Sequence, residues 1–476
     1  MPDCFFAYFY FLINIYKSMR IKIFGEKRNI YFVGIGGISM SALAKMLKTW
    51  GYAVCGYDAA QGRQVRALTD CGISVEIGGE CSEMLMRAEI VVYTDAVPQN
   101  DVRLTYARNA GKMVLSRADL LSVLCGQFSR VIAVAGSHGK TTCTAMCAHI
   151  LKETGVPFAA HIGGEDFSLD NFTMTGTEFL VTEACEYKKN LSKIHADSAI
   201  LLNVDKDHLE CYSGVEELKQ HFFDYVKAAK TSFLCADDVN CRKFIEKNLL
   251  QNAILFGCDD INNDYNATEI KRTVDGYKFC VTEYGKRLCH AQIHVAGRHN
   301  IYNALAAFAC LRSYGFDERQ IVEGLRRFKG IRRRFERLGE AYGAMVIADY
   351  AHHPREIAAT LCAAEEFFFT KKDKGKLFVV FQPHTYSRTK MLMEEFVEVL
   401  QGVENLVVYR TFAARESYDE EGSAKALSDR LGNAIYADNV HTLETYLKTS
   451  VKETDVVLFL GAGDVYTVAQ YLSQIR

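Results

Sequence analysis

The stretch VIAVAGSHGKTTCTAM, residues 131–146, decides the fold of the central part of the chain. Its first five residues are apolar, which indicates a buried strand, and the residues from Lys140 onward favour a helix. Between them lies the turn Gly136–Gly139. Glycines let backbone N–H groups approach phosphate oxygens, and a following helix presents its positive end to them. The stretch therefore predicts a phosphate loop, although its two glycines stand closer together than those of the common P-loop.

Length and composition set the class of protein. A chain of 476 residues is too long for one core, so we expect two to four domains. Hydrophobic residues make up 49% and charged residues 24%, as in ordinary globular proteins, and the formal net charge of −2 points to no nucleic-acid or acidic-membrane partner. The 16 cysteines are scattered without a C-x-x-C pair. We interpret them as reduced thiols in a cytoplasmic protein.

The N-terminus carries an apolar run, Cys4–Tyr16, that we do not assign to the folded protein. It has 13 residues, whereas a membrane-spanning helix needs about 20. Asp3 precedes it, where a signal peptide would carry positive charge. We predict that Met19 is the natural start and that residues 1–18 are dispensable.

Apolar strands alternate with helical stretches throughout, which predicts α/β domains with largely parallel sheets. We place the boundaries at 1–129, 130–331 and 332–476. In the first block a strand over Asn29–Val33 runs into the turn Gly34–Gly37 and a helix. This is similar to a dinucleotide fingerprint, but Ser39 stands where the third glycine belongs. A dehydrogenase-type NAD site, with Asp58 on the ribose, and a plain strand-to-helix turn both remain open.

Polar residues follow several predicted strands, and ligands bind at the carboxyl ends of such strands. In the phosphate loop, Lys140 offers a point charge and Thr141 a hydroxyl for Mg²⁺. Glu183 ends the strand in FLVTEA, and His208 lies beyond another strand in NVDKDHLE. Because Mg²⁺ prefers oxygen ligands, His208 taken alone is equally consistent with an ordinary loop residue.

Two further groups are ambiguous on their own. Asn300 and Asn303 share a helix face, so their amides predict either contact with a base edge or capping of the helix start. The cluster Arg332–Arg334 is either a solvated face or a phosphate contact. By contrast, the loops ADYAHHPRE and FQPHTYSRTK follow neighbouring strands, and their His and Arg residues could together grip a small carboxylate.

Seven motifs occur in the order found in the Mur ligase family, which has this shortened phosphate loop. They are AGSHGKTT, TEACEY, NVDKDHLE, GRHNIYNALAA, ADYAHHPRE, FQPHTYSRTK and LGAGD. The resemblance runs from about Met19 to the C-terminus. It implies three domains: a Rossmann-like domain for a UDP-sugar, a central P-loop-type ATPase domain, and a Rossmann-like C-terminal domain for an amino acid.

The resemblance also implies site residues. The ATP-binding set is Gly136, Ser137, His138, Gly139, Lys140, Thr141, Thr142, Asn300, Asn303 and Arg333, and the magnesium set is Thr141, Glu183 and His208. The substrate set is Gly34, Gly36, Gly37, Ser39, Asp58, Thr94, His352, His353 and Arg388. Lys140, Glu183, His208, His353 and Arg388 are the catalytic candidates.

The activity implied is ATP-dependent joining of L-alanine to UDP-N-acetylmuramate through an acyl phosphate, in cytoplasmic peptidoglycan precursor synthesis. ATP and Mg²⁺ are the expected cofactors. The expected partners are small molecules only, with no nucleic acid or membrane, in a monomer or weak homodimer. A related ligase that adds a preformed peptide or another amino acid is the alternative, and a sensor without turnover is a more distant one. Ser137, Glu210 and Thr385 depart from the commonest family pattern and leave the fine amino-acid contacts open.

Overall fold

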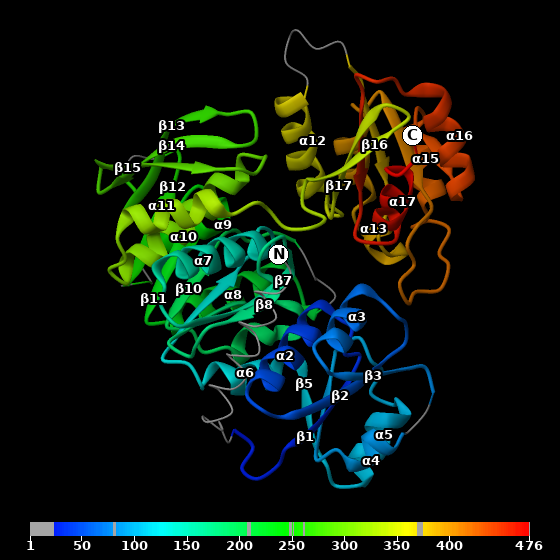
Figure 1. Ribbon diagram of the computed structural model, residues 1–476. Coiled ribbons are helices and arrows are strands. Elements are labelled where there is room, and N and C mark those ends of the chain that lie inside the picture. The colour runs from blue at the N-terminus through cyan, green and yellow to red at the C-terminus, as the bar shows by residue number, and fades with distance from the viewer. Residues whose placement is uncertain are drawn as a thin grey trace. The chain divides into compact units, whose positions relative to one another are not determined.

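The computed structural model describes residues 23–79, 82–206, 211–246, 250, 252–259, 262–368 and 375–475 (Figure 1). The protein chain divides into two compact units. The first is drawn from Met1–Ile270, Phe279–Ile293 and Tyr302–Lys329, and the second from Lys271–Lys278, His294–Ile301 and Gly330–Arg476. Within the described part, no helix is both long and apolar enough to cross a membrane. His208 and the apolar run Cys4–Tyr16 lie outside the described residues.

The first unit begins with a five-stranded parallel sheet in the order β3-β2-β1-β4-β5. Its strands are β1 (Asn29–Val33), β2 (Ala53–Asp58), β3 (Ser74–Ile77), β4 (Ile90–Tyr93) and β5 (Met113–Ser116). Its helices are α2 (Ile38–Thr49), α3 (Arg63–Asp70), α4 (Glu83–Arg87), α5 (Val102–Asn109) and α6 (Arg117–Cys125). The strand order reverses between β1 and β4, which is where a Rossmann-type sheet binds its ligand. The predicted Rossmann-like fold of the first domain is confirmed.

A ten-stranded sheet follows in the same unit, in the order β15-β14-β13-β12-β11-β10-β6-β9-β7-β8. The strands are β6 (Arg130–Ala135), β7 (Phe158–Asp166), β8 (Asp170–Met174), β9 (Phe179–Glu183), β10 (Ser198–Leu201), β11 (Thr231–Cys235), β12 (Ala253–Gly257), β13 (Tyr265–Arg272), β14 (Tyr277–Glu283) and β15 (Lys286–Ile293). The helical segments are α7 (Lys140–Thr154), η1 (Tyr187–Lys193), α8 (Val215–Ala228), α9 (Val239–Glu246), α10 (His299–Ser313) and α11 (Glu318–Arg327). The central strand β6 pairs in parallel with β10 and β9, and its residues 131–135 are buried on both faces, as an apolar run requires.

The two sheets of the first unit are joined through α2. Lys45 of α2 is 8% exposed, and its Nζ donates to Asp170 Oδ2 (2.6 Å) and Asn171 Oδ1 (2.7 Å) of the β7–β8 hairpin. The Asn171 amide donates in turn to Ile38 O (2.7 Å) at the start of α2. Because Lys45 and Asn171 are buried and bonded to each other, they fix the start of α2 against the second sheet.

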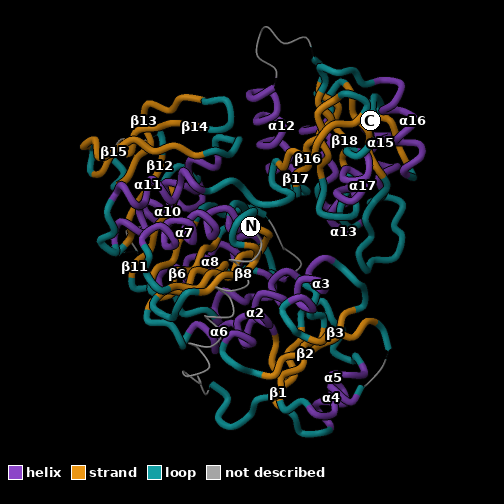
Figure 2. Tube along the Cα trace, in the orientation of Figure 1, coloured by secondary structure: helices purple, strands orange, loops and turns teal. Residues whose placement is uncertain are grey.

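The second unit contains a six-stranded sheet in the order β16-β17-β21-β18-β19-β20, in which only the β16–β17 pair is antiparallel. Figure 2 draws its strands in orange and its helices in purple. Its strands are β16 (Glu336–Ala341), β17 (Ala344–Asp349), β18 (Leu377–Phe381), β19 (Asn405–Tyr409), β20 (Ile435–Ala437) and β21 (Val456–Leu460). Its helices are α12 (Pro354–Phe368), α13 (Tyr386–Met391), α14 (Met393–Leu400), α15 (Ala424–Leu431), α16 (Val440–Ser450) and α17 (Val465–Leu472). Apolar clusters lie on both faces of this sheet, as expected for the predicted α/β domain.

Candidate active site

The phosphate loop has a conformation that requires glycine at both ends. Gly136 has φ 136° and Gly139 has φ 84°, in the region that other residues rarely adopt. A Cβ at Gly139 would also lie 2.6 Å from Asn303 Oδ1. The amide of Asn203 braces the loop: Asn203 Oδ1 accepts from His138 N (2.8 Å), and Asn203 Nδ2 donates to His138 O (3.0 Å). The strand–loop–helix predicted for this stretch is therefore present.

Lys140 points back into the loop and meets a buried carboxylate. Its Nζ donates to Ser137 O (3.1 Å) and to Gly136 O. The same Nζ lies 3.1 and 3.2 Å from the two carboxylate oxygens of Glu186. The Glu186 side chain is wholly buried and that of Lys140 is 15% exposed, so the pair is shielded from water. Glu186 was not predicted from the sequence.

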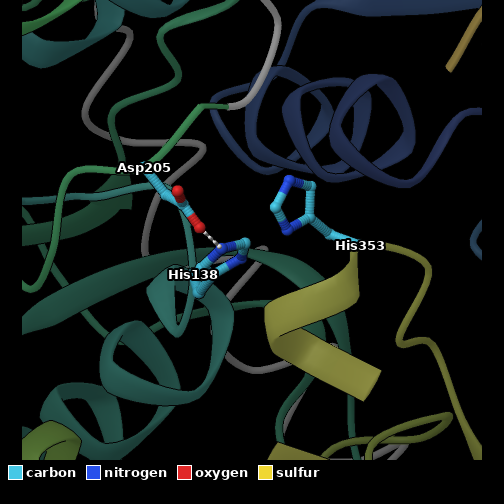
Figure 3. Close-up of side chains that lie close together, drawn as sticks. All are labelled: His138, Asp205 and His353. Carbon is cyan, nitrogen blue, oxygen red and sulfur yellow. Dashed lines mark hydrogen bonds and ion pairs between the residues drawn. The ribbon is translucent and has the colours of Figure 1, made fainter. Parts of the chain in front are cut away.

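Asp205 supports the loop from the end of the neighbouring strand β10. Its carboxylate lies 3.2 Å from His138 Nε2 (Figure 3), and its backbone N–H donates to Ser137 Oγ (2.8 Å). Ser137 and Thr141 are almost completely buried, at 7% and 8% exposure, while Thr142 is half-buried. The loop is thus held in place from several sides.

Glu183 is the last residue of β9, next to β6 and therefore beside the phosphate loop. Its Oε1 accepts from Gly163 N (2.6 Å), and a Cβ at position 163 would lie 2.6 Å from Glu183 Oε2. Only glycine therefore leaves room for this carboxylate. The Thr141 hydroxyl, in the first turn of α7, and the Glu183 carboxylate, at the end of β9, are hard oxygen donors, and this donor set fits Mg²⁺. The structure does not describe His208, so its role as a ligand stays a prediction.

The glycine turn of the first sheet is tied to Asp58. Asp58 Oδ2 accepts from Gly36 N (2.7 Å), and a Cβ at Gly36 would lie 2.8 Å from that oxygen. Gly34 has φ 81° and packs against Thr94, while Gly37 precedes α2 with its backbone extended. Asp58, predicted as a ribose contact, thus has a bond that shapes the turn itself.

Ser39, in the first turn of α2, begins a buried hydrogen-bonded chain. Its Oγ lies 2.8 Å from His161 Nε2, and His161 Nδ1 lies 2.8 Å from Thr182 Oγ1. Burial, together with the charge of Arg117, lowers the pKa of His161 to about 3, so the imidazole is neutral. Thr182 immediately precedes Glu183. The chain therefore links the glycine turn to the strand that carries the candidate metal ligand.

The two asparagines differ in their surroundings. Asn300 Nδ2 donates to Ala296 O (2.6 Å), in the segment just before α10, which ties this segment to the start of the helix. Asn303 is 3% exposed and lies against Gly139 of the phosphate loop. Their contact with adenine stays a prediction.

In the second unit, the two predicted amino-acid loops lie side by side. The rings of His352 and His384 are 5.7 Å apart, and His384 stacks on Phe412 at 5.5 Å. Burial, with the charges of His352 and Arg388 in addition, lowers the pKa of His384 to about 4. Arg388 lies in α13, one turn after His384.

Two further contacts involve residues in or next to these loops. His353 is 6% exposed, and its backbone N–H lies 3.3 Å from Glu356 Oε2. Glu394, an acidic residue near Arg388 in sequence, accepts a hydrogen bond from Arg430 (2.5 Å). Arg388 as an anchor for the amino acid stays a prediction.

Arg333 has a structural environment within the second unit. Its guanidinium donates to Ala462 O (3.0 Å) and Gly463 O (3.1 Å), and it lies over the rings of Tyr350 and Tyr466 at 4.7 and 5.0 Å. These contacts hold the LGAGD loop to the start of the unit. Contact of Arg333 with the nucleotide is a separate prediction that these bonds do not test.

Three family models match successive parts of the chain. The model of the Mur ligase family, catalytic domain, covers residues 29–129, that of the Mur ligase middle domain 134–311, and that of the Mur ligase, glutamate ligase domain 333–463. The boundaries proposed at 129/130 and 331/332 remain a proposal.

Individual relatives match over almost the whole length. The UDP-N-acetylmuramate–L-alanine ligase of Caldanaerobacter subterraneus is 36% identical over 461 residues, covering 95% of this chain and 98% of the relative. The crystal structure of the UDP-N-acetylmuramate-alanine ligase MurC of Thermotoga maritima has a TM-score of 0.79 at 28% identity, covering 94% and 98%. A murein peptide ligase of Psychrobacter arcticus has a TM-score of 0.73 at 22% identity, covering 94% and 99%, a likeness of fold alone. With all three domains matched in order, the chain belongs to the Mur ligase family.

Proposed function

We propose that this protein joins L-alanine to UDP-N-acetylmuramate in an ATP-dependent reaction of peptidoglycan precursor synthesis. The observation that carries the proposal is the 36% identity, over 95% of the chain, to a ligase of that name. The phosphate loop, the carboxylate beside it and the histidine-bearing loops of the second unit supply side chains suited to the chemistry.

The reaction needs two steps because a carboxylate is a poor acyl donor. In the first, a carboxylate oxygen of the sugar nucleotide forms a bond to the γ-phosphorus of ATP, and ADP leaves. In the second, the amine of alanine attacks the acyl carbon, phosphate leaves, and the nitrogen gives up a proton. Phosphoryl transfer of this kind depends on positioning and charge neutralisation more than on covalent catalysis by the protein.

Lys140, the loop N–H groups and the N-terminus of α7 are the groups that neutralise the phosphates. To do so, Lys140 Nζ turns N–H donors from Gly136 O and Ser137 O toward phosphate oxygens. Its third donor can stay on Glu186, because an ammonium carries three protons. The charge of the lysine is then held in place while the phosphate chain is bound.

Thr141, Glu183 and His208 are the residues that would hold Mg²⁺. When bound, the ion would help to neutralise the charge on the phosphates during transfer. Gly163, through its N–H bond to Glu183 Oε1, holds this carboxylate in place. Glu183 and the loop start are both at the carboxyl end of the sheet, where the ligand of such a fold is expected.

Alanine requires an anchor for its carboxylate and an acceptor for the amine proton. Arg388 can provide the first through its planar, always-charged fork. His384, with its pKa lowered to about 4, is neutral at physiological pH and can therefore accept a proton. His352 and His353, on the adjoining loop, complete the proposed alanine-binding region.

The remaining expectations concern surroundings and assembly. All the cysteines that the structure describes are free thiols, which supports a reducing compartment, and we propose the cytoplasm. A monomer or weak homodimer remains our proposal for the assembly, as does the absence of nucleic-acid and membrane partners.

Phosphate release tests the function. Purified protein is given ATP, Mg²⁺ and UDP-N-acetylmuramate, and release is compared with alanine, glycine, serine or a preformed tripeptide as acceptor. We expect release that depends on alanine. Release with the tripeptide but not with alanine would favour the peptide-adding alternative, and saturable NAD binding without UDP-sugar binding would favour the dehydrogenase.

A further inference from the structure

Arg117 has no role in the mechanism described above. It is the first residue of α6, directly after β5, at the carboxyl edge of the first sheet. Its side chain is partly buried, and its Nη1 donates to Ser39 Oγ at 3.4 Å. Among the residues that the structure describes, this is its one hydrogen bond, and no carboxylate is within ion-pair distance.

Other arginines of the same unit differ in this respect. Arg103, which is more deeply buried, pairs with Asp101 at 3.0 Å, and Arg130 pairs with Glu178 at 3.0 Å. A guanidinium has five N–H donors and cannot lose its proton in a protein. A partly buried Arg117 with one long hydrogen bond therefore offers several donors and a full charge to an anion.

The partner of Arg117 is oriented by the chain through His161. Thr182 Oγ1 donates to Glu183 O (3.4 Å), so it accepts the proton of His161 Nδ1. The neutral imidazole then has only Nε2 as an acceptor, and the Ser39 hydroxyl donates to it. Ser39 Oγ is left to accept from Arg117, which fixes where the guanidinium lies.

The position of Arg117 indicates which anion it meets. Ser39 follows the glycine turn, which by our proposal binds the sugar nucleotide, and the bonded chain ends at Glu183. The guanidinium thus lies beside the sugar-nucleotide turn, at the end of a bonded chain that leads to Glu183.

We propose that Arg117, held by Ser39, binds the carboxylate of the sugar nucleotide, the group that receives the phosphoryl group. A planar guanidinium matches a carboxylate with two parallel hydrogen bonds. This inference rests on the proposed function, because it assigns the reacting carboxylate to a residue. The diphosphate of the same substrate is the other anion that could bind there.

Two ligands separate the carboxylate from the diphosphate. UDP-N-acetylmuramate and UDP-N-acetylglucosamine share the uridine and diphosphate, but only the first has the carboxylate. We expect Arg117→Ala to weaken binding of UDP-N-acetylmuramate at least tenfold in equilibrium titration and to change binding of UDP-N-acetylglucosamine less than twofold. Arg117→Lys should restore part of the loss, because it keeps the charge without the fork. Arg108→Ala, which removes an exposed arginine on α5, is the matched control and should bind both ligands normally.

Several results would overturn the assignment. Equal weakening of both ligands by Arg117→Ala would assign the arginine to the diphosphate. Unchanged binding of UDP-N-acetylmuramate by a folded variant would remove Arg117 from the site. The titrations need no turnover, so they are independent of the reaction. If the wild-type protein bound UDP-N-acetylmuramate through Arg117 yet released no phosphate with alanine, the proposed function would fail while the carboxylate site would stand.

Discussion

Replacing Lys140 by alanine removes more than a phosphate contact, because it leaves the Glu186 carboxylate without its partner. Glu186 is wholly buried, and Lys140 Nζ lies 3.1 Å from its Oε1. Breaking a buried pair by deleting one partner typically costs about 3–5 kcal/mol. The carboxylate can instead take up a proton, which at pH 7 also costs a few kcal/mol (about 3–4), because a glutamate of the unfolded chain is ionised there. We therefore expect Lys140→Ala to lose about 3–4 kcal/mol of stability at pH 7.

The size of this loss depends on pH in a defined direction. Protonating the orphaned carboxylate becomes easier as pH falls, at about 1.4 kcal/mol per unit. Between pH 7 and pH 5.5 the proton route becomes cheaper by about 2 kcal/mol, so the loss should shrink by roughly half. For a domain of this size, one kcal/mol shifts Tm by about 2–4 °C. A Tm drop of about 10 °C at pH 7 should therefore fall to about 5 °C at pH 5.5.

Scanning calorimetry of four proteins tests the reasoning. The wild type is compared with Lys140→Ala, with Lys140→Ala/Glu186→Gln, and with Lys152→Ala, an exposed lysine in the last turn of the same helix. The double variant should recover most of the stability because it removes the orphaned charge, and Lys152→Ala should unfold like the wild type. A normal Tm for Lys140→Ala at both pH values would refute the argument, as would a double variant no more stable than the single one. The double variant is also the fair test of turnover, which should still be lost.

Gly163→Ala would place a Cβ 2.6 Å from Glu183 Oε2 and displace that carboxylate, so alanine-dependent phosphate release should fall roughly 100-fold. Activity within threefold of wild type would mean that the reaction does not need the Glu183 carboxylate in its present position. In the folded protein the pKa of His161 is about 3, against an ordinary value near 6.5, so the unfolded chain takes up the proton first and stability is lost as pH falls below 6.5. The free energy of unfolding should be about 2 kcal/mol lower at pH 5 than at pH 7.5. Urea unfolding of His161→Asn should therefore depend less on pH than that of the wild type, and parallel pH profiles would count against the argument. Arg388→Ala should raise the KM for alanine at least tenfold with little change in the KM for ATP, and Arg388→Lys should recover only part of this loss. An unchanged alanine KM in a folded Arg388→Ala variant would exclude Arg388 as the anchor.

The local parts of the fold could be predicted because each depends on neighbouring residues. The strand Asn29–Val33, its glycine turn and the following helix are found where the apolar run and the glycines indicate them. The same holds for the phosphate loop and for the strand that ends at Glu183. A strand in the middle of a parallel sheet is apolar on both faces, and this makes its ends easy to find in a sequence.

Strands at the sheet edges were harder to predict. The β7–β8 hairpin and the strands β13, β14 and β15 were not among the predicted strands. The strands β13, β14 and β15 alternate polar with apolar residues or carry charges, as in EIKR of β13, and several of their side chains are exposed. Such segments lack the continuous apolar run that marks a central strand.

Contacts within the site were also beyond the sequence, since they join residues far apart in the chain. Nothing local indicates that Glu186 bonds to Lys140, 46 positions away, or that His161 lies between Ser39 and Thr182. Gly163 resembles any other glycine until the carboxylate of Glu183 is seen against it. The motif residues could be named from the sequence, whereas the residues that hold them required the fold.

The charged groups of the candidate site differ in what a ligand must displace. Lys140 is bonded to two loop carbonyls and a buried carboxylate, so phosphates gain its donors only by replacing bonds already made. When Arg117 binds an anion it loses no bond to a carboxylate, because within the described residues its only hydrogen bond is the long one to Ser39. A net binding energy is the difference between bonds formed and bonds lost, including those to water. An anion at Arg117 therefore keeps more of its interaction energy than the same charge at Lys140. On this argument the arginine serves to hold a substrate carboxylate in the ground state, and the lysine serves mainly where charge on the phosphates must be neutralised during transfer.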